Sequence, residues 1–217
     1  MGVARPSFEK GGIYHVYNRG VAKQDIFTTD RDRAHFLEIL SFYRDGSFDR
    51  RLSHLSQDQL LEVLARDPEE PLVEILAYCL MPNHFHLVLR DLVGGGVSTF
   101  LRRALNSYVH YFNTKHNRVG PLFQGPYQIV VVRTDEQLLH VSRYLHLNPV
   151  VARLCTEPSN YTWSSMSTYS SGHTSRLCQS QMILALSGSG ERYEAFVRDY
   201  ADYAISLHDY KDLLLDL

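Results

Sequence analysis

Two hydrophobic periods alternate along the chain, and each change of period marks the end of an expected element. Residues 13–18 alternate between apolar and polar side chains, which is typical of a half-buried strand. Thr29 then offers a helix cap, and the apolar positions behind it repeat at helical spacing up to Gly46. The apolar run 73–81, a Pro-Asn turn and the run 84–90 predict two further strands joined as a hairpin.

The second half of the pattern predicts another helix, strand and helix. A flexible glycine run at 94–96 precedes Ser98, which we expect to cap a helix of about five turns. Residues 127–132 are rich in β-branched side chains and predict a strand, after which Asp135 begins a helix that Pro149 stops. The order β-α-β-β-α-β-α predicts an α+β fold, a ferredoxin-like antiparallel sheet with its helices on one face.

Two segments lie outside this core pattern. Residues 48–70 place leucines at helical spacing before an Asp-Pro break, so we expect a helical insertion there. The core domain is expected to span residues 1–158. Residues 159–217 are expected to form a C-terminal extension that is first loop-rich and then helical, with an acidic tail.

Composition limits the class of protein. At 217 residues and 44% hydrophobic content, the chain can bury one substantial core. Its apolar stretches are far shorter than the roughly 20 residues of a membrane helix, and its first residues lack the apolar core of a signal peptide. The three cysteines form no CxxC pair, which favours a reducing cytoplasm over a disulfide framework.

Charge is unevenly distributed. The formal net charge of −2 argues weakly against a nucleic-acid partner. Residues 97–153, however, hold seven basic side chains against two acidic ones. Such a segment is either a solubilising surface or a surface that binds phosphate groups. On the second interpretation, we expect DNA contacts from basic residues of this segment and from two basic residues that follow the first strand: Arg19, Lys23, Arg102, Arg103, Lys115, Arg118 and Arg143.

The second strand of the hairpin begins with His84-Phe85-His86. Because side chains alternate along a strand, both imidazoles project from one face and Phe85 from the other. Two imidazoles on one face can hold a metal ion. The same pattern also occurs as two half-exposed histidines on a sheet without any ligand.

The last predicted helix carries Tyr144 and Asn148 four residues apart, on one helical face. His140 extends this face by one turn. A phenol with a pKa near 10 is a weak nucleophile at neutral pH and needs a polarised phosphate or a base nearby. Two imidazoles with the amide oxygen of Asn148 would suit Mg²⁺ or Mn²⁺ better than a structural zinc ion. With 14 tyrosines in the chain, simple packing is the alternative.

Four segments occur together and in order: Tyr-His-Val-Tyr-Asn-Arg-Gly at 14–20, Met-Pro-Asn-His-Phe-His-Leu-Val-Leu at 81–89, Gly-Pro-Leu-Phe-Gln at 120–124 and Ser-Arg-Tyr-Leu-His-Leu-Asn-Pro-Val at 142–150. A Tyr-Thr-Trp-Ser-Ser stretch follows them. Over residues 12–169 the chain thereby resembles the IS200-like tyrosine transposases. It is most similar to the branch associated with repetitive extragenic palindromes (REP), the RAYT proteins.

The resemblance implies an HUH nuclease fold and a DNA-cutting activity. His84 and His86 match the two metal ligands of that family, and Tyr144 matches the nucleophile that becomes linked to a DNA 5′-phosphate. Relatives place a glutamine ligand four residues after the tyrosine, where this chain has Asn148, which keeps the amide oxygen but shortens its reach. His140 is the substitute if the helix rotates. The implied cofactor is Mg²⁺ or Mn²⁺.

The resemblance also implies a partner, a single-stranded DNA hairpin with a REP-like palindrome. It implies a nucleoid-associated protein when DNA is bound, working as a monomer or a homodimer. Three alternatives remain at this point. The chain could be a domesticated hairpin-binding protein without strand transfer, or a small metallohydrolase, although acidic residues are absent around His84 and Tyr144. A replication initiator or relaxase would share the chemistry but place the segments differently.

Overall fold

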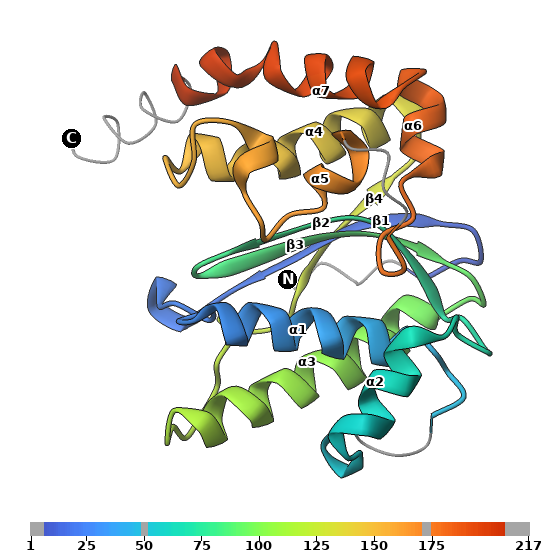
Figure 1. Cartoon of the computed structure of the whole chain (residues 1–217), viewed down its shortest axis with the longest axis vertical. Helices are drawn as coiled ribbons and strands as arrows, with labels where there is room; N and C mark the ends of the chain where they lie inside the picture. Colours follow the sequence, from blue (N-terminus) through green and yellow to red (C-terminus); the bar gives the residue numbers. More distant parts are fainter. Residues whose placement is uncertain (1–6, 49–51, 171–174, 207–217) are drawn as a thin grey trace.

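A four-stranded antiparallel sheet forms the centre of the computed structural model, which describes residues 7–48, 52–170 and 175–206 (Figure 1). The strand order is β2-β3-β1-β4. Adjacent strands pair antiparallel throughout. The α+β class and the antiparallel sheet are as predicted from the hydrophobic pattern. The strands are β1 (Ile13–Arg19), β2 (Val73–Met81), β3 (His84–Asp91) and β4 (Gln128–Val132).

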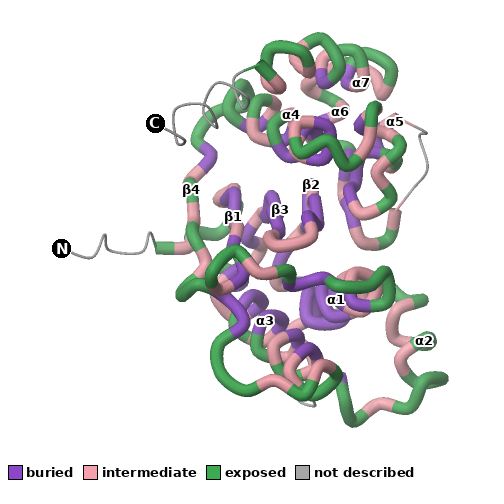
Figure 2. The backbone as a smooth tube through the Cα atoms, turned by 90° about the vertical axis from the view of Figure 1, so that its left-hand side faces the viewer, coloured by how far each residue is buried: buried purple, intermediate pink, exposed green. Residues whose placement is uncertain are grey.

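One face of the sheet is covered by α1 (Asp30–Tyr43) and α3 (Gly96–Lys115). Alternate residues of the central strands, including Val16 and Phe85, point to this side and are fully buried in one hydrophobic cluster. Figure 2 shows buried stretches of the strands between the helices of the two layers. The face covered by α1 and α3 thus contains the larger part of the core.

The other face is covered by α4 (Asp135–Val151), and the prediction of helices on one face only is wrong. Leu76, Cys79 and Val88 project to this side and are buried in a second cluster with α4 and the C-terminal extension. Because both faces of the central strands are apolar, both require a cover. The extension comprises η3 (Pro158–Asn160), α5 (Met166–Ser170), α6 (Gln181–Ser187) and α7 (Gly190–Arg198).

The C-terminal extension also covers the outer edge of β2. Ser164 bridges to Cys79 and Cys178 bridges to Ile75, so a strand edge that would otherwise expose unpaired backbone groups is capped. The extension therefore packs on the core. Residues 171–174 and the predicted acidic tail at 207–217 lie outside the described residues.

The predicted insertion contains η2 (Leu52–His54) and α2 (Gln57–Ala65), and a further short turn, η1 (Val21–Lys23), follows β1. Ser56 and Gln59 form a reciprocal capping box that begins α2. Residues 49–51 of the insertion lie outside the described part. Within the ranges that the structure describes, no helix is both long and apolar enough to cross a membrane.

Two helix boundaries differ from those predicted. Helix α3 begins at Gly96 and not behind Ser98. The buried Asp91 carboxylate accepts hydrogen bonds from the backbone N–H groups of Val93 (3.0 Å) and Val97 (2.9 Å), so Asp91 caps the helix in place of Ser98. Helix α4 continues through Pro149, and the backbone N–H of Ala152 still reaches the carbonyl of Asn148 at 2.9 Å.

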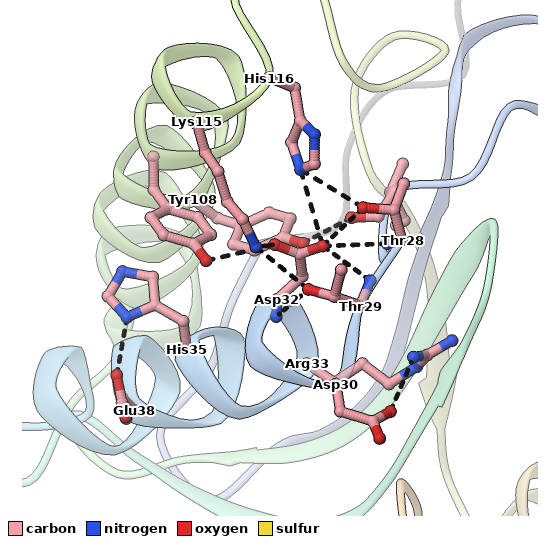
Figure 3. A network of polar contacts seen from close by, with 12 residues as sticks. Thr28, Thr29, Asp30, Asp32, Arg33, His35, Glu38, Tyr108, Lys115 and His116 are labelled. Atoms are coloured by element: carbon pink, nitrogen blue, oxygen red, sulfur yellow. Dashed lines mark hydrogen bonds and ion pairs between the residues drawn. The ribbon is translucent and has the colours of Figure 1, made fainter.

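The start of α1 is tied to the end of α3 by a buried carboxylate, Asp32 (Figure 3). Its Oδ2 accepts hydrogen bonds from the Thr28 hydroxyl (2.8 Å) and the Thr29 backbone N–H (2.9 Å). Its Oδ1 accepts from Lys115 Nζ at 2.6 Å and from the Tyr111 hydroxyl at 3.2 Å. These contacts join two helices that are distant in sequence.

Candidate active site

Strand β3 presents His84 and His86 on the α4 side of the sheet. Phe85, between them, is buried in the opposite cluster with α1 and α3. The two imidazole centroids are 5.0 Å apart, with their planes nearly perpendicular at 87°. The alternation predicted from the sequence thus brings both rings to one place.

Helix α4 places Tyr144 against these rings. The Tyr144 ring lies 5.7 Å from the His86 ring, centroid to centroid, at 87°. Tyr144 is 55% exposed, while His86 beneath it is 5% exposed. A cavity of about 410 Å³ joins them, lined by Tyr17, Asn18, Arg19, His84, His86, Gln124, Pro126, Gln128 and Tyr144.

Hydrogen bonds define which nitrogen of His84 faces this cavity. Asn83 Nδ2 donates to the carbonyl of Lys23 at 3.1 Å, so Asn83 Oδ1 is the atom turned to His84. Oδ1 lies 2.6 Å from His84 Nδ1. Because Oδ1 only accepts, His84 Nδ1 carries the hydrogen and donates it. The Nε2 lone pair of His84 is therefore free, as a metal ligand requires.

The imidazoles of the site are neutral at pH 7. Burial, and then the charge of Arg19, lower the pKa of His84 to about 4. Burial, and then the neighbouring His84 and His15, hold the pKa of His86 well below its usual value. Burial lowers the pKa of His15 to about 4. Neutral imidazole is the form that binds metal ions, so the protonation states favour ion binding.

Asn148 lies one helical turn beyond Tyr144 on α4. Its Nδ2 atom is buried and has no hydrogen-bond partner within the described part of the chain. Burial raises the pKa of the Tyr144 phenol, and the nearby Asn148 amide partly opposes that shift. This unpaired N–H group beside the predicted nucleophile can donate to an oxygen atom of a substrate, whereas a metal ion would need the amide oxygen.

The donor set fits a weakly held divalent ion. The residues described include no group of three or more His, Cys, Asp or Glu side chains that could hold a metal ion. Two imidazoles and one amide remain, so phosphate oxygens from a substrate would have to complete the coordination of Mg²⁺ or Mn²⁺. Neither Asn148 nor His140, the predicted substitute ligand, is part of the cavity lining. His140 instead contacts Arg143 and Glu136.

The predicted DNA-contacting residues are divided between the two sides of the sheet. Arg19 lines the Tyr144 cavity, and Lys23 lies close by, its carbonyl bonded to Asn83. Arg102, Arg103 and Lys115 line a larger hollow of about 840 Å³ beside α3, on the other side of the sheet. Lys115 is paired with Asp32, and Arg118 donates a hydrogen bond to Gln24 and lies over the Phe112 ring.

Arg143 is held by the C-terminal extension. Its guanidinium carbon lies 4.2 Å from the ring centroid of Phe196 and 4.1 Å from that of Tyr200. One turn along α4, the buried His146 contacts the Tyr193 hydroxyl (2.7 Å) and Ser165 Oγ (2.8 Å). The extension thus fixes the outer side of the helix that carries Tyr144.

These contacts predict that Arg143→Ala weakens folding more than DNA binding. We expect a loss of about 1 kcal/mol in the free energy of unfolding, from two cation–π contacts, with little change in the salt dependence of DNA affinity. Denaturant unfolding and binding titrations measure the two effects. Arg102→Ala is the matched control and should reduce the salt slope of binding by about one. If Arg143→Ala instead reduced the salt slope of binding and left the free energy of unfolding unchanged, Arg143 would be the DNA contact.

Five polar residues at the site were assigned no role from the sequence: His15, Tyr17, Asn18, Gln124 and Gln128. His15 Nε2 lies 2.9 Å from His86 Nδ1. Gln124 reaches the cavity because its backbone N–H donates to the Arg19 carbonyl at 2.8 Å. The segments at 14–20 and 120–124 contain His15 and Gln124. The pairing of β1 with β3 brings His15 to the two histidines, and the bridge between Gly20 and Phe123 brings Gln124 to the end of β1.

The fold and the site together define a class: an antiparallel α+β domain in which a helical tyrosine faces two histidines of a central strand. Among solved structures, the chain is similar to a REP-associated tyrosine transposase bound to a REP hairpin. The likeness has a TM-score of 0.57 and covers 82% of this chain and 92% of that chain, with 16% sequence identity. It shows that the two proteins share a fold. No family model and no curated protein matched the sequence.

Proposed function

We propose that this protein is a tyrosine transposase that cleaves and rejoins single-stranded DNA folded into a hairpin. One observation carries the proposal: Tyr144 from α4 and the His84–His86 pair from β3 meet in one cavity open to solvent. The shared fold with a transposase that binds a REP hairpin supports the same assignment. The resemblance in sequence at four ordered segments agrees with it.

The chain's own residues suit a transesterification. Tyr144 Oη would form a bond to phosphorus while the bond from phosphorus to the 3′-oxygen breaks. The phenol loses its proton to solvent, and the leaving 3′-oxygen takes one up. The DNA is then joined through its 5′-phosphate to Tyr144, and a free 3′-hydroxyl can reverse the step and join a new strand. Arg19, exposed at the rim, can hold a phosphate of the cut strand.

His84 and His86, with Asn148, would hold a divalent ion, which supplies Lewis-acid polarisation of the phosphate. The free Nε2 of His84 supports the two-histidine part of this assignment, and Asn148 would contribute its Oδ1 atom. Because the protein offers few ligands, ion binding should depend on the DNA phosphate. We therefore expect Mn²⁺ to bind more tightly in the presence of a DNA hairpin than in its absence.

The duplex part of a hairpin would bind the α3 side of the sheet. Helix α3, described over its whole length, carries no acidic residue, and Arg102 and Arg103 lie side by side at the hollow. Phosphate groups are attracted to such a surface. A substrate that contacts both this hollow and Tyr144 has to extend around the sheet, which a folded strand with a single-stranded arm can do.

Cleavage should accelerate as the pH rises. Burial raises the pKa of Tyr144 above its usual value near 10. The phenolate fraction below that pKa grows about tenfold per pH unit, so the single-turnover rate should rise between pH 7 and pH 9 without a plateau. A rate measured to be flat over this interval would show that ionisation of the phenol does not limit the reaction.

The experiment that tests the function uses a labelled hairpin taken from the DNA flanking the gene, incubated with and without Mg²⁺ or Mn²⁺ and run on a denaturing gel. A label at the 3′ end should be retained on the protein, whereas a label at the 5′ end should leave on a short free fragment. Binding without any retained label would favour the alternative, a hairpin-binding protein without strand transfer.

A further inference from the structure

A third imidazole, His15, adjoins the two-histidine strand. His15 lies on β1 two residues from Tyr17, which pairs with His86 across the sheet, so His15 projects from the same face as His86. The residue is only 7% exposed and is not part of the cavity lining. It therefore acts on the site through His86, and not on a substrate directly.

The contact between His15 and His86 is an in-plane hydrogen bond. His15 Nε2 and His86 Nδ1 are 2.9 Å apart, and the ring planes differ by 22°. The ring centroids are 5.2 Å apart, longer than the nitrogen separation by about two ring radii. The geometry is that of two rings pointing at each other along one N–H···N bond.

The direction of this bond decides what His86 presents to the cavity. If His86 accepted at Nδ1, its hydrogen would sit on Nε2 and an N–H would face the cavity. If His86 donates from Nδ1, its Nε2 lone pair faces the cavity. Only the second arrangement matches His84, whose Nδ1 donates to Asn83 and whose Nε2 is free.

We propose that His15 is a positioning residue that accepts the hydrogen bond of His86 Nδ1–H and thereby holds the His86 Nε2 lone pair toward the cavity. Asn83 and His15 then form a matched pair of outer partners, one for each imidazole. The hydrogen bond between His15 and His86 does not depend on the proposed function. Its effect on ion binding rests on the proposed function. Outer partners of this kind fix the tautomer and ring orientation of a ligand histidine.

The direct test is the tautomer of His86 in the full chain without metal, read from the ¹⁵N chemical shifts of histidine-labelled protein and assigned with His86→Asn. The wild type should carry the hydrogen on Nδ1. His15→Leu should lose this preference, whereas His15→Gln should keep it, because its Oε1 can accept in place of the imidazole. Ile13→Ala, a packing change on the same strand and face, is the control and should leave the tautomer unchanged.

A second readout is Mn²⁺ affinity, followed by the electron paramagnetic resonance of the free ion. His15→Leu should bind Mn²⁺ about 10- to 100-fold more weakly than wild type, the usual loss for an outer partner, and His15→Gln should recover most of this loss. A wild-type His86 with its hydrogen on Nε2, or a folded His15→Leu protein with the wild-type tautomer or Mn²⁺ affinity, overturns the proposal. Because neither readout involves DNA, a failure of covalent adduct formation overturns the proposed function alone.

Discussion

Tyr144→Phe is expected to bind a hairpin as the wild type does and to form no covalent adduct with it. The substitution removes the hydroxyl but keeps the ring that packs 5.7 Å from His86, so the cavity and the fold should be retained. Loss of a nucleophile typically lowers a rate by several orders of magnitude. Adduct formation on a denaturing gel and hairpin affinity by fluorescence anisotropy give the two measurements.

The matched control is Tyr17→Phe, which changes the other phenol in the cavity lining. This variant should still form the adduct, even if its rate differs from that of the wild type. Adduct in normal yield from Tyr144→Phe, together with its loss in Tyr17→Phe, would transfer the nucleophile role to Tyr17. Loss of hairpin binding in Tyr144→Phe would instead assign Tyr144 to recognition.

Asp32→Asn is expected to cause the largest loss of stability, about 3 kcal/mol at pH 7. The side chain is fully buried and its two oxygens accept five hydrogen bonds, including those from Lys115 and Thr29. An amide nitrogen in place of one oxygen would face donors, and breaking a buried charged contact typically costs about 3–5 kcal/mol. Asp30→Asn, on an exposed side chain two residues away, should change stability by less than about 1 kcal/mol.

The effect of Asp32 should depend on pH in a defined direction. Burial alone would raise the pKa of Asp32, but hydrogen bonds from Lys115, Thr28 and Thr29 outweigh it and hold the pKa well below its usual value. The stabilisation is therefore complete above the unfolded pKa of about 3.9 and is lost as the pH falls toward the folded pKa. Urea unfolding of wild type and Asp32→Asn should give curves that converge below about pH 4. Equal stabilities at pH 7 would contradict the role of the network.

Local sequence patterns predict the strands well because the apolar period is imposed by the sheet itself. The apolar run 73–81 predicts both ends of β2, and the run that begins at His84 predicts the start of β3; the structure confirms all three positions. The start of α3 was misplaced because its cap, Asp91, belongs to the preceding strand. The second helical layer was missed because the pattern of single strands does not show which face a later helix will cover.

The core of the site was predictable for the same reason. Strand alternation places His84 and His86 together, and helical spacing relates Tyr144 to Asn148. His15 and Gln128 could not be assigned, because only the pairing of β1 with β3 and β4 brings them beside the histidines. The surroundings of Arg143 could not be predicted either, because the aromatic rings around it come from residues 53 and 57 positions later in the chain. Its role as a DNA contact stays a prediction.

The most direct test of Tyr144 as the nucleophile is to identify the residue that carries DNA after cleavage. A hairpin with a nick just upstream of the cut site would release a short fragment that carries the 3′-hydroxyl needed for reversal, so the adduct would be trapped. The adduct can then be digested with protease and nuclease and mapped by mass spectrometry. We expect a short nucleotide joined through its 5′-phosphate to the peptide that contains Tyr144. A nucleotide on any other residue, or on none while the DNA is cut, would contradict it.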